Sequence, residues 1–205
     1  VISAIADSFS AEKGRRVFAL DGWYGTEFRS IISALDAELK RRGATVEFVN
    51  INKIFRSKDE IGLYKQEFIT DDPGFGFVNM DGSISDIMDK QKLSDLDNEL
   101  KAAESVIVYG YGAAIPELFD AYTCTYYFDK TRQPLLWEMW DGKLIPFGEE
   151  APRKDYHWKE YYYCDYYLLH FQKEFIIEKM DFYVEAIDYN ALKLLPREAY
   201  DEIVK

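Results

Sequence analysis

The sequence predicts an α/β domain in which a mostly parallel sheet lies between two layers of helices, a three-layer α/β/α arrangement. The first observation is a strand–turn–helix–strand unit over residues 16–51. The second is a strongly apolar strand at 105–112, SVIVYGYG, which ends in a glycine turn. The third is the continued alternation of strands with helices. The 205 residues are interpreted as a single domain, since that length suits one large domain.

The opening unit follows from apolar spacing. Residues 16–20, RVFAL, form a short apolar run typical of a buried parallel strand. The next apolar residues fall on one face of a helix. They are Phe28, Ile31, Ile32, Leu35 and Leu39. Gly43 is placed to end this helix in the left-handed conformation, and TVEFVNI at 45–51 predicts a second strand. No element is predicted for residues 1–14.

The middle of the chain is less regular. Residues 56–95 are predicted to form an irregular excursion, because DDPGFG and MDGS are turn-forming. A short helix is expected at 94–104 with Ser94 as its cap, and a strand is expected at 121–128.

The last third is predicted to hold a loop or hairpin at 137–156, one long aromatic-rich helix at 157–182 and a final helix after Pro196. In the long helix, Tyr163, Tyr167 and Phe171 are spaced by four and form one stripe. We interpret the stripe as core plus an interface to another domain. The alternative is an aromatic platform for a sugar or a base.

The charge and composition of the chain argue against several classes of binding partner. The net charge of -12 argues against nucleic acid and against an anionic membrane surface, since both require clustered Lys and Arg. No segment approaches the ~20 apolar residues of a membrane span, and no N-terminal signal is visible. Two cysteines make no disulfide framework, which favours a reducing, cytoplasmic location. The start at Val1 and the helical pattern at Lys205 indicate a piece of a longer protein.

The turn after the first strand has the context of a phosphate loop. Such a loop reads G-x-x-x-x-G-K-[ST] between a strand and a helix, and its glycines let backbone N–H groups surround the phosphates. Here the segment is GWYGTEFRS, Gly22 to Ser30, and it retains Gly22, Gly25 and Thr26.

The three functional positions of this loop are altered. Glu27 stands where the second motif glycine belongs, Phe28 where the Lys belongs, and Arg29 where the Ser or Thr belongs. A carboxylate repels phosphate, and the helical spacing of Phe28 points its ring into the core. Ser30 lies one place too late to hold magnesium. The pattern therefore predicts a retained scaffold with an inactive phosphate loop.

The stretch VFALDGWYGTEFRSIISALDAELKRRGATVEFVN resembles the opening of uridine kinases and their relatives, with Asp21, Gly22, Gly25 and Gly43 in matching positions. SVIVYGYGAAIPELF is similar to that family's strand ending in Glu-Gly, with Tyr109 at the place of the Glu. DDPGFG resembles the family's substrate-side region. The resemblance covers about residues 16–130 and implies a P-loop NTPase fold.

Two groups of polar residues are further candidates. Asp71 and Asp72 have the chemistry of a general base in phosphoryl transfer, although Asp-Asp before Pro and Gly is typical of a turn. Asp129, Lys130 and Arg132 follow a strand, where α/β proteins place ligand contacts, although a solvated loop fits equally well. The histidines His157 and His170 and the cysteines Cys124 and Cys164 lack zinc spacing, so no metal is expected.

Two functions are compatible with these features. The first is a non-catalytic kinase-like module without a cofactor, whose helix N-terminus could still hold a small phosphorylated ligand. YYYCDYYLLHFQKEF…MDFYVEAID resembles the closing segment of the N-terminal module in bacterial mannose-6-phosphate isomerase-type proteins. That resemblance implies a partner in the C-terminal domain of the same parent or in a homo-oligomer. The alternative is an active nucleoside or sugar kinase using Mg-ATP, with Arg29 replacing the Lys and Asp71 or Asp72 as base.

Overall fold

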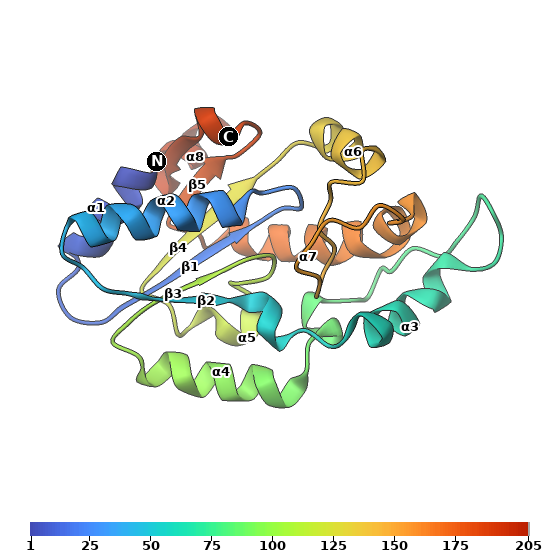
Figure 1. Ribbon diagram of the computed structural model, residues 1–205, viewed down its shortest axis with the longest axis horizontal. Coiled ribbons are helices and arrows are strands. Elements are labelled where there is room, and N and C mark those ends of the chain that lie inside the picture. The colour runs from blue at the N-terminus through green and yellow to red at the C-terminus, as the bar shows by residue number, and fades with distance from the viewer. Residues whose placement is uncertain (205) are drawn as a thin grey trace.

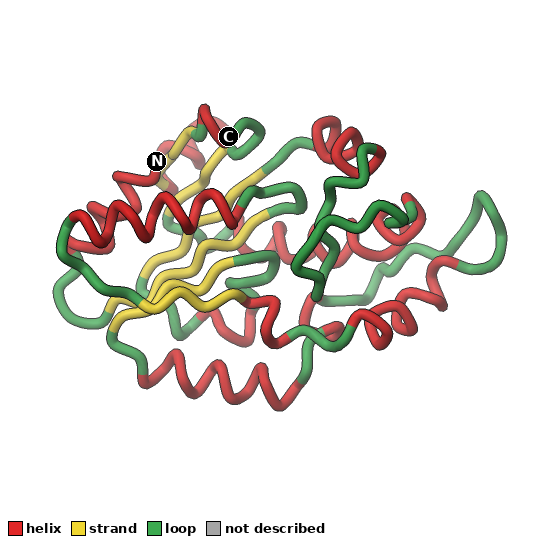
Figure 2. Tube along the Cα trace, viewed as in Figure 1, coloured by secondary structure: helices red, strands yellow, loops and turns green. Residues whose placement is uncertain are grey.

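The computed structural model describes residues 1–204. Its centre is a six-stranded sheet with the strand order β2-β3-β1-β4-β5-β6 (Figures 1 and 2). The strands are β1 (Arg16–Gly22), β2 (Glu47–Asn50), β3 (Ser105–Tyr109), β4 (Cys124–Asp129), β5 (Phe182–Glu185) and β6 (Lys193–Pro196). All neighbouring pairs are parallel except β5 and β6, which are antiparallel. The predicted mostly parallel sheet is confirmed.

Eight α-helices surround the sheet within the described residues. They are α1 (Ile2–Ala11), α2 (Phe28–Arg41), α3 (Lys58–Ile69), α4 (Lys90–Ala102), α5 (Pro116–Phe119), α6 (Arg132–Trp140), α7 (Tyr166–Ile177) and α8 (Arg197–Val204). A π-helical segment, Glu160–Asp165, runs directly into α7. Short 3-10 helices occupy Ile51–Ile54, Ile84–Ile87 and Tyr189–Ala191.

The side chains of β1 alternate between two helical layers. On one face, the ring of Phe18 meets Phe9 of α1 edge-on, with the ring centroids 5.0 Å apart. On the other face, Ala19 shares a buried cluster with Ile176 of α7, and Asp21 accepts a hydrogen bond from the α7 side chain of Gln172. Helices α1 and α2 therefore cover one face and α7 covers the other (Figure 1), which confirms the three-layer arrangement.

Helix α2 matches its prediction closely. Phe28, Ile31, Leu35 and Leu39 are buried, as the spacing requires. At its end, Gly43 has φ +75°. The Gly43 N–H bonds to Lys40 O and the Ala44 N–H to Leu39 O, which is the Schellman arrangement. A β-carbon at residue 43 would strain this turn.

Several elements differ from the predictions. Helix α4 begins at Lys90 rather than 94, because Asp89 and not Ser94 accepts the capping bond, from the Lys92 N–H. The predicted long helix at 157–182 ends at Ile177, and its last residue begins β5. The stacking of Phe182 on Tyr126, with centroids 4.7 Å apart, shows that pairing with β4 outweighs the local helical pattern.

Helices were also missed in three segments. Residues 1–14 contain α1, whose apolar face buries Ile5 and Phe9. The excursion at 56–95 contains α3, which begins with a capping box between Ser57 and Glu60. The segment 137–156 includes the end of α6. Irregular structure is concentrated in the loop at 70–80, which projects from the molecule beyond α3 in Figure 1.

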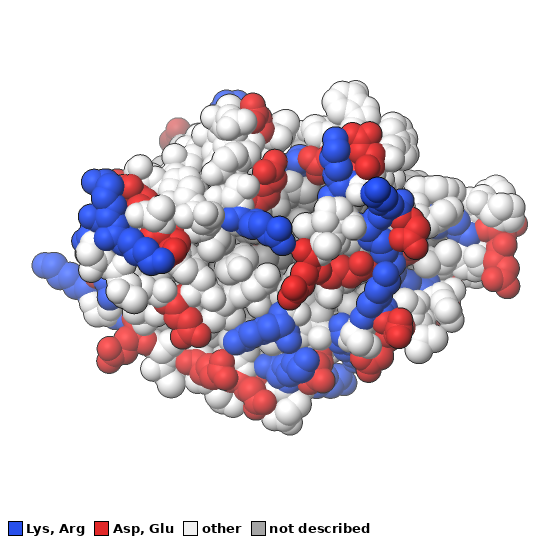
Figure 3. Space-filling model, in the orientation of Figure 1, with Lys and Arg blue, Asp and Glu red and all other residues white. Residues whose placement is uncertain are grey.

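The surface is of mixed charge. In the view of Figure 3, basic and acidic side chains are interspersed, and neither sign covers this face. Among residues 1–204, no helix has both the length and the apolar character to cross a membrane.

Candidate functional site

The turn between β1 and α2 is the segment for which the sequence predicts a phosphate-loop remnant. Strand β1 ends at Gly22 and α2 begins at Phe28, the position of the motif Lys. Gly25 has φ +81°. Several amides of the turn are already bonded inside the protein: Trp23 N–H donates to Phe128 O, Thr26 N–H to Trp23 O, and Phe28 N–H to Thr26 O. These amides are not free to bind phosphate.

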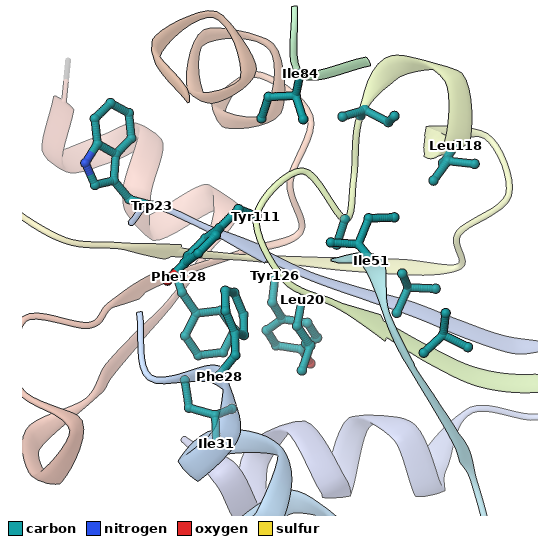
Figure 4. Packing of buried hydrophobic residues seen from close by; sticks show 14 of the residues in the cluster. Leu20, Trp23, Phe28, Ile31, Ile51, Ile84, Tyr111, Leu118, Tyr126 and Phe128 are labelled. Carbon is teal, nitrogen blue, oxygen red and sulfur yellow. The ribbon is translucent and has the colours of Figure 1, made fainter. Parts of the chain in front are cut away.

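Phe28 fills the base of the turn with an aromatic ring. It is buried and lies near Tyr111 and Phe128, with ring centroids 5.6 and 5.9 Å away (Figure 4). The ring centroid of Tyr109 is 6.3 Å away. The prediction that Phe28 points into the core is confirmed. Its neighbour Tyr109 is the residue that the resemblance to uridine kinases aligns with a Glu.

An ion pair lies against the middle of the turn. The ammonium group of Lys130, just after β4, donates to Gly25 O at 2.9 Å and pairs with the Glu138 carboxylate of α6. The Lys130 side chain is 4% exposed. A β-carbon added to Gly25 would lie 2.5 Å from a Glu138 oxygen, so the pair packs directly on this glycine. An entering phosphate would have to displace a carboxylate.

Tyr24 ties the turn to the helices beyond the sheet. Its hydroxyl donates to Asp165 Oδ2 at 3.0 Å and accepts from the Phe147 N–H at 2.9 Å. Asp165 is fully buried, and its Oδ2 also lies 2.6 Å from the Lys65 ammonium of α3. Burial raises the pKa of Asp165, and Lys65 opposes that shift. The turn is thus fastened through one side chain to both α3 and the π-helical segment.

Asp21 links the ends of β1 and β3. Its Oδ1 accepts from the Gly22 and Gly112 N–H groups at 2.7 and 2.8 Å. Its Oδ2 accepts from the Ala114 N–H at 3.1 Å and from the Gln172 amide at 2.7 Å. Burial raises the pKa of Asp21 to about 6, against these four donors. All four bonds are internal, so the residue organises the loops instead of facing a ligand.

The remaining residues of the turn do not assemble a phosphate site. Glu27 and Arg29 are exposed. The Arg29 guanidinium donates to Glu150 O at 3.3 Å. The Ser30 hydroxyl donates to the Glu27 carboxylate at 3.4 Å, and the buried Thr26 hydroxyl donates to Trp23 O at 2.8 Å. Neither hydroxyl faces a position from which it would hold magnesium beside a phosphate.

Asp71 and Asp72 lie in the projecting loop after α3. Both are exposed. The Asp72 carboxylate accepts from the Gly74 and Phe75 N–H groups, both at 2.8 Å, and these bonds lower the pKa of Asp72. This is the turn that the Asp-Pro-Gly pattern is typical of. The loop extends away from the β1–α2 turn in Figure 1, so the structure does not bring the two carboxylates to the phosphate-loop remnant.

The aromatic stripe is largely covered from within. Tyr163 is buried, and its hydroxyl donates to Gly74 O at 3.2 Å. Tyr167 and Phe171 are half-buried. The aromatic side chains most open to solvent in this region are instead Tyr162, at 54% exposure, and Phe75 and Phe77 of the projecting loop, at 75% and 69%.

The histidines and cysteines are dispersed. Burial raises the pKa of both Cys124 and Cys164 to about 12. His170 stacks on Tyr166 with the rings 8° from parallel, and His157 lies near Trp158. No group of three His, Cys, Asp or Glu side chains among residues 1–204 is arranged to hold a metal ion.

A cavity of about 530 Å³ opens beside the turn, at the carboxyl end of β4. Asp129, Lys130 and Arg132, which sequence position singled out, all line it. Trp23 of the β1–α2 turn forms part of the same wall. The structure therefore brings the segment after β4 together with the phosphate-loop remnant.

The sequence did not identify the residues that contact the β1–α2 turn and its neighbours from other parts of the chain, namely Glu138, Lys65, Asp165 and Gln172. One signal was present, because Asp165 interrupts the aromatic run YYYCDYYLL, and an acid within an apolar helical stretch calls for a buried partner. Nothing near Lys65 or Glu138 in the sequence identifies the partner of either residue. Lys65 and its partner Asp165 are 100 residues apart, and Glu138 meets Lys130 only because α6 folds back over the end of β4.

Comparison with known proteins places the fold. A possible uridine kinase from Bacillus stearothermophilus is similar over 91% of this chain and 97% of its own, with a TM-score of 0.53 and 14% identity. A proposed fructose transport system kinase from Silicibacter sp. TM1040 is similar over 64% of this chain and 75% of its own, with a TM-score of 0.46 and 12% identity. The likeness to the first structure supports the fold of a P-loop kinase.

At the level of sequence, the family model described as a domain of unknown function, DUF8485, matches residues 2–205. No curated protein matches the chain.

Proposed function

The chain belongs to the DUF8485 family, and we propose that it is a non-catalytic module built on the fold of a P-loop kinase. The observation that supports this proposal is the packing of side chains in and against the β1–α2 turn. The ring of Phe28 replaces the motif Lys, and the Lys130–Glu138 pair is packed on Gly25. The module would act through its surfaces and not through phosphoryl transfer.

Electrostatics supports the same conclusion. Two carboxylates, Glu27 and Glu138, lie in or against the turn, and its nearest ammonium group, that of Lys130, is already paired. A unit charge about 4 Å from a like charge costs roughly 4 kcal/mol at the effective dielectric near a protein surface. A triphosphate carries several such charges, so the turn disfavours it strongly.

Calorimetric titration with Mg-ATP, run beside a thermal-shift assay, tests the proposal. We expect no heat and no stabilisation at millimolar nucleotide. A ligand present at 100 times its dissociation constant would stabilise the fold by about 2.7 kcal/mol, which is easily seen. Micromolar binding would contradict the proposal and favour the alternative, an active nucleoside or sugar kinase with an atypical loop. Phosphoryl transfer to such acceptors would then be assayed directly.

Rebuilding the loop provides a second arm. The triple variant Glu27→Gly, Phe28→Lys, Arg29→Thr restores the motif residues but leaves the Glu138 carboxylate against Gly25. We expect it to bind Mg-ATP only when Glu138→Gln is added, provided that the variants remain folded by circular dichroism. Equal affinity of the triple and quadruple variants would show that the ion pair does not block the turn.

The parent protein is a separate part of the proposal. The resemblance of residues 161–188 to mannose-6-phosphate isomerase-type proteins supports an N-terminal module whose catalytic, metal-binding domain lies outside these residues. The exposed aromatic side chains Phe75, Phe77 and Tyr162 are suited to contact such a domain. Reading the encoding gene beyond residue 205 tests this directly, because a continuation without a metal-binding cupin domain would remove the isomerase link.

A further inference from the structure

We propose that the cavity at the carboxyl ends of β1 and β4 binds a small organic anion built on a planar ring. Its volume, about 530 Å³, lies within the range of small-molecule sites. This site goes beyond the proposed function, since it lies beside the phosphate-loop remnant and does not require that loop to open.

The position in the sheet is one where α/β proteins bind ligands. Strands β1 and β4 are parallel neighbours, with Gly22 beside Phe128 at their ends. The chain leaves β1 for α2 on one face of the sheet and leaves β4 for α6 and then α7, which covers the other face (Figure 1). Loops that diverge in this way leave a crevice at the strand ends, and the cavity lies there.

The walls of the cavity are aromatic. Tyr166 is central to them: Trp23 meets its ring edge-on, with centroids 5.7 Å apart, and His170 stacks on it at 5.7 Å. Tyr161 and Tyr200 also line the cavity. Flat rings of this kind bury a planar ligand ring at low entropic cost, because they have few rotatable bonds.

One cation in the cavity is available to a ligand. Lys130 is neutralised by Glu138, and Lys173 lies 2.7 Å from Asp129. Arg132 has no carboxylate within ion-pair distance in the part of the chain that the structure describes; its guanidinium lies over the Tyr166 ring, 5.2 Å from the centroid, and donates to the Tyr166 hydroxyl at 3.2 Å.

The Arg132 guanidinium uses one N–H group on the Tyr166 hydroxyl, which leaves its other N–H groups to bind a ligand. Their fork matches the two oxygens of a phosphate or carboxylate group. The aromatic wall and the guanidinium adjoin one another at Tyr166. The ligand class that satisfies both is therefore a planar ring carrying one acidic group.

Three probes separate the two halves of this recognition. Phenyl phosphate carries the ring and the anion, inorganic phosphate only the anion, and phenol only the ring. In ¹⁵N-resolved NMR titrations we expect phenyl phosphate to shift the indole signal of Trp23 and to bind at least tenfold more tightly than either fragment. Benzoate, as a fourth probe, distinguishes a preference for phosphate from one for carboxylate.

Arg132→Gln is the variant that tests the cation. Arg132 is exposed, so the substitution should leave the fold intact, and we expect it to weaken phenyl phosphate binding about tenfold while leaving phenol binding unchanged. The matched control is Arg41→Gln, an exposed arginine at the end of α2 and outside the cavity, which should bind like the wild type. Unchanged affinity in the Arg132 variant, or inorganic phosphate binding as tightly as phenyl phosphate, would overturn the proposal. Binding of Mg-ATP by the wild-type protein that Arg132→Gln leaves unchanged would instead count against the proposed non-catalytic function alone.

Discussion

The two sides of β1 hold the phosphate-loop remnant in different ways. On the α2 side the contacts are aromatic rings, with Phe28 between Tyr109, Tyr111 and Phe128. On the α7 side they are buried polar groups, with Asp21 bonded to Gln172 and, further along, Tyr24 bonded to Asp165. Both sides bury side chains of one short turn, yet the ring contacts of Phe28 are uncharged, whereas the contacts of Asp21 and Tyr24 include buried carboxylates.

The difference shows two ways of burying the side chains of a short turn. On the α2 side, rings pack around Phe28 as in any core, and no charge has to be solvated there. The α7 side retains ionisable groups, which must be fully paired because an unpaired buried charge is costly. We therefore expect the loss of stability caused by a substitution on the α7 side to depend on the partner of the substituted group and on pH. On the α2 side, the loss should depend on side-chain volume alone.

The largest expected effect is on the α7 side, at Lys65. Lys65→Met leaves the fully buried Asp165 carboxylate without its cation, and breaking a buried pair in this way costs about 3–5 kcal/mol. Urea denaturation would measure the free energy of unfolding. The double variant Lys65→Met, Asp165→Leu removes both charges and should be more stable than the Lys65 single variant.

An exposed ion pair is the control for this prediction. Lys40 lies 2.7 Å from Asp36 on the surface of α2, with a side chain that is 68% exposed, and Lys40→Met should change the free energy of unfolding by less than about 0.5 kcal/mol. The loss of stability in the Lys65→Met, Asp165→Leu double variant is compared with the sum of the losses in the Lys65→Met and Asp165→Leu single variants. If the two values were equal, the two charges would not be coupled, and the comparison of the two sides would fail.

The next effect is on the α2 side, at Phe28. Phe28→Ala removes a buried ring and leaves a cavity, which costs about 3 kcal/mol, the lower end for such changes, since the residue is at the first turn of its helix. Phe28→Leu should cost clearly less. Because no charge is involved, the loss should be the same at pH 5 and pH 8 when followed by urea denaturation. A loss that varied with pH would mean that the α2 side also rests on a titrating group.

The contacts on the two sides of β1 also differ in how well the sequence predicts them. The α2 side was predictable, because the apolar period from Phe28 to Leu39 and the glycine at 43 are local signals that packing then reinforced. Local spacing also explains why the burial of Phe28 could be foreseen. That the loop is inactive stays a prediction, which rests on the three adjacent residues Glu27, Phe28 and Arg29.

The α7 side was not predictable in the same way. Lys65 and Asp165 are 100 residues apart, and Gln172 reaches Asp21 across 151 residues. No local pattern identifies such partners. Similarly, β5 was hidden at the end of an expected helix, since its pairing with β4 is settled only when the sheet forms. The segment after β4 was marked by its position at a strand end, but the aromatic cavity around it required the fold.

The smallest of these effects is a pH dependence set by Asp21. Its pKa is raised from 3.8 to about 6 by burial, so the folded state binds this proton more tightly than the unfolded state. The stability contributed by the neutral form is therefore present below the unfolded pKa and lost as pH rises through the folded one. Between pH 4.5 and pH 7 the loss from this group amounts to about 2 kcal/mol. Other carboxylates also titrate in this range, so the quantity to measure is the wild-type free energy of unfolding minus that of Asp21→Asn.

That difference should fall by about 2 kcal/mol from pH 4.5 to pH 7 in urea denaturation, because the contribution of all other groups cancels. Gln172→Met sharpens the test. It removes one of the four donors that hold the pKa of Asp21 down, so its stability should continue to fall at higher pH than that of the wild type. A difference that stays constant between pH 4.5 and pH 7 would show that the four hydrogen bonds outweigh burial. Asp21 would then stabilise the α7 side as an ion, and the polar contacts of β1 would be as independent of pH over this range as its aromatic ones.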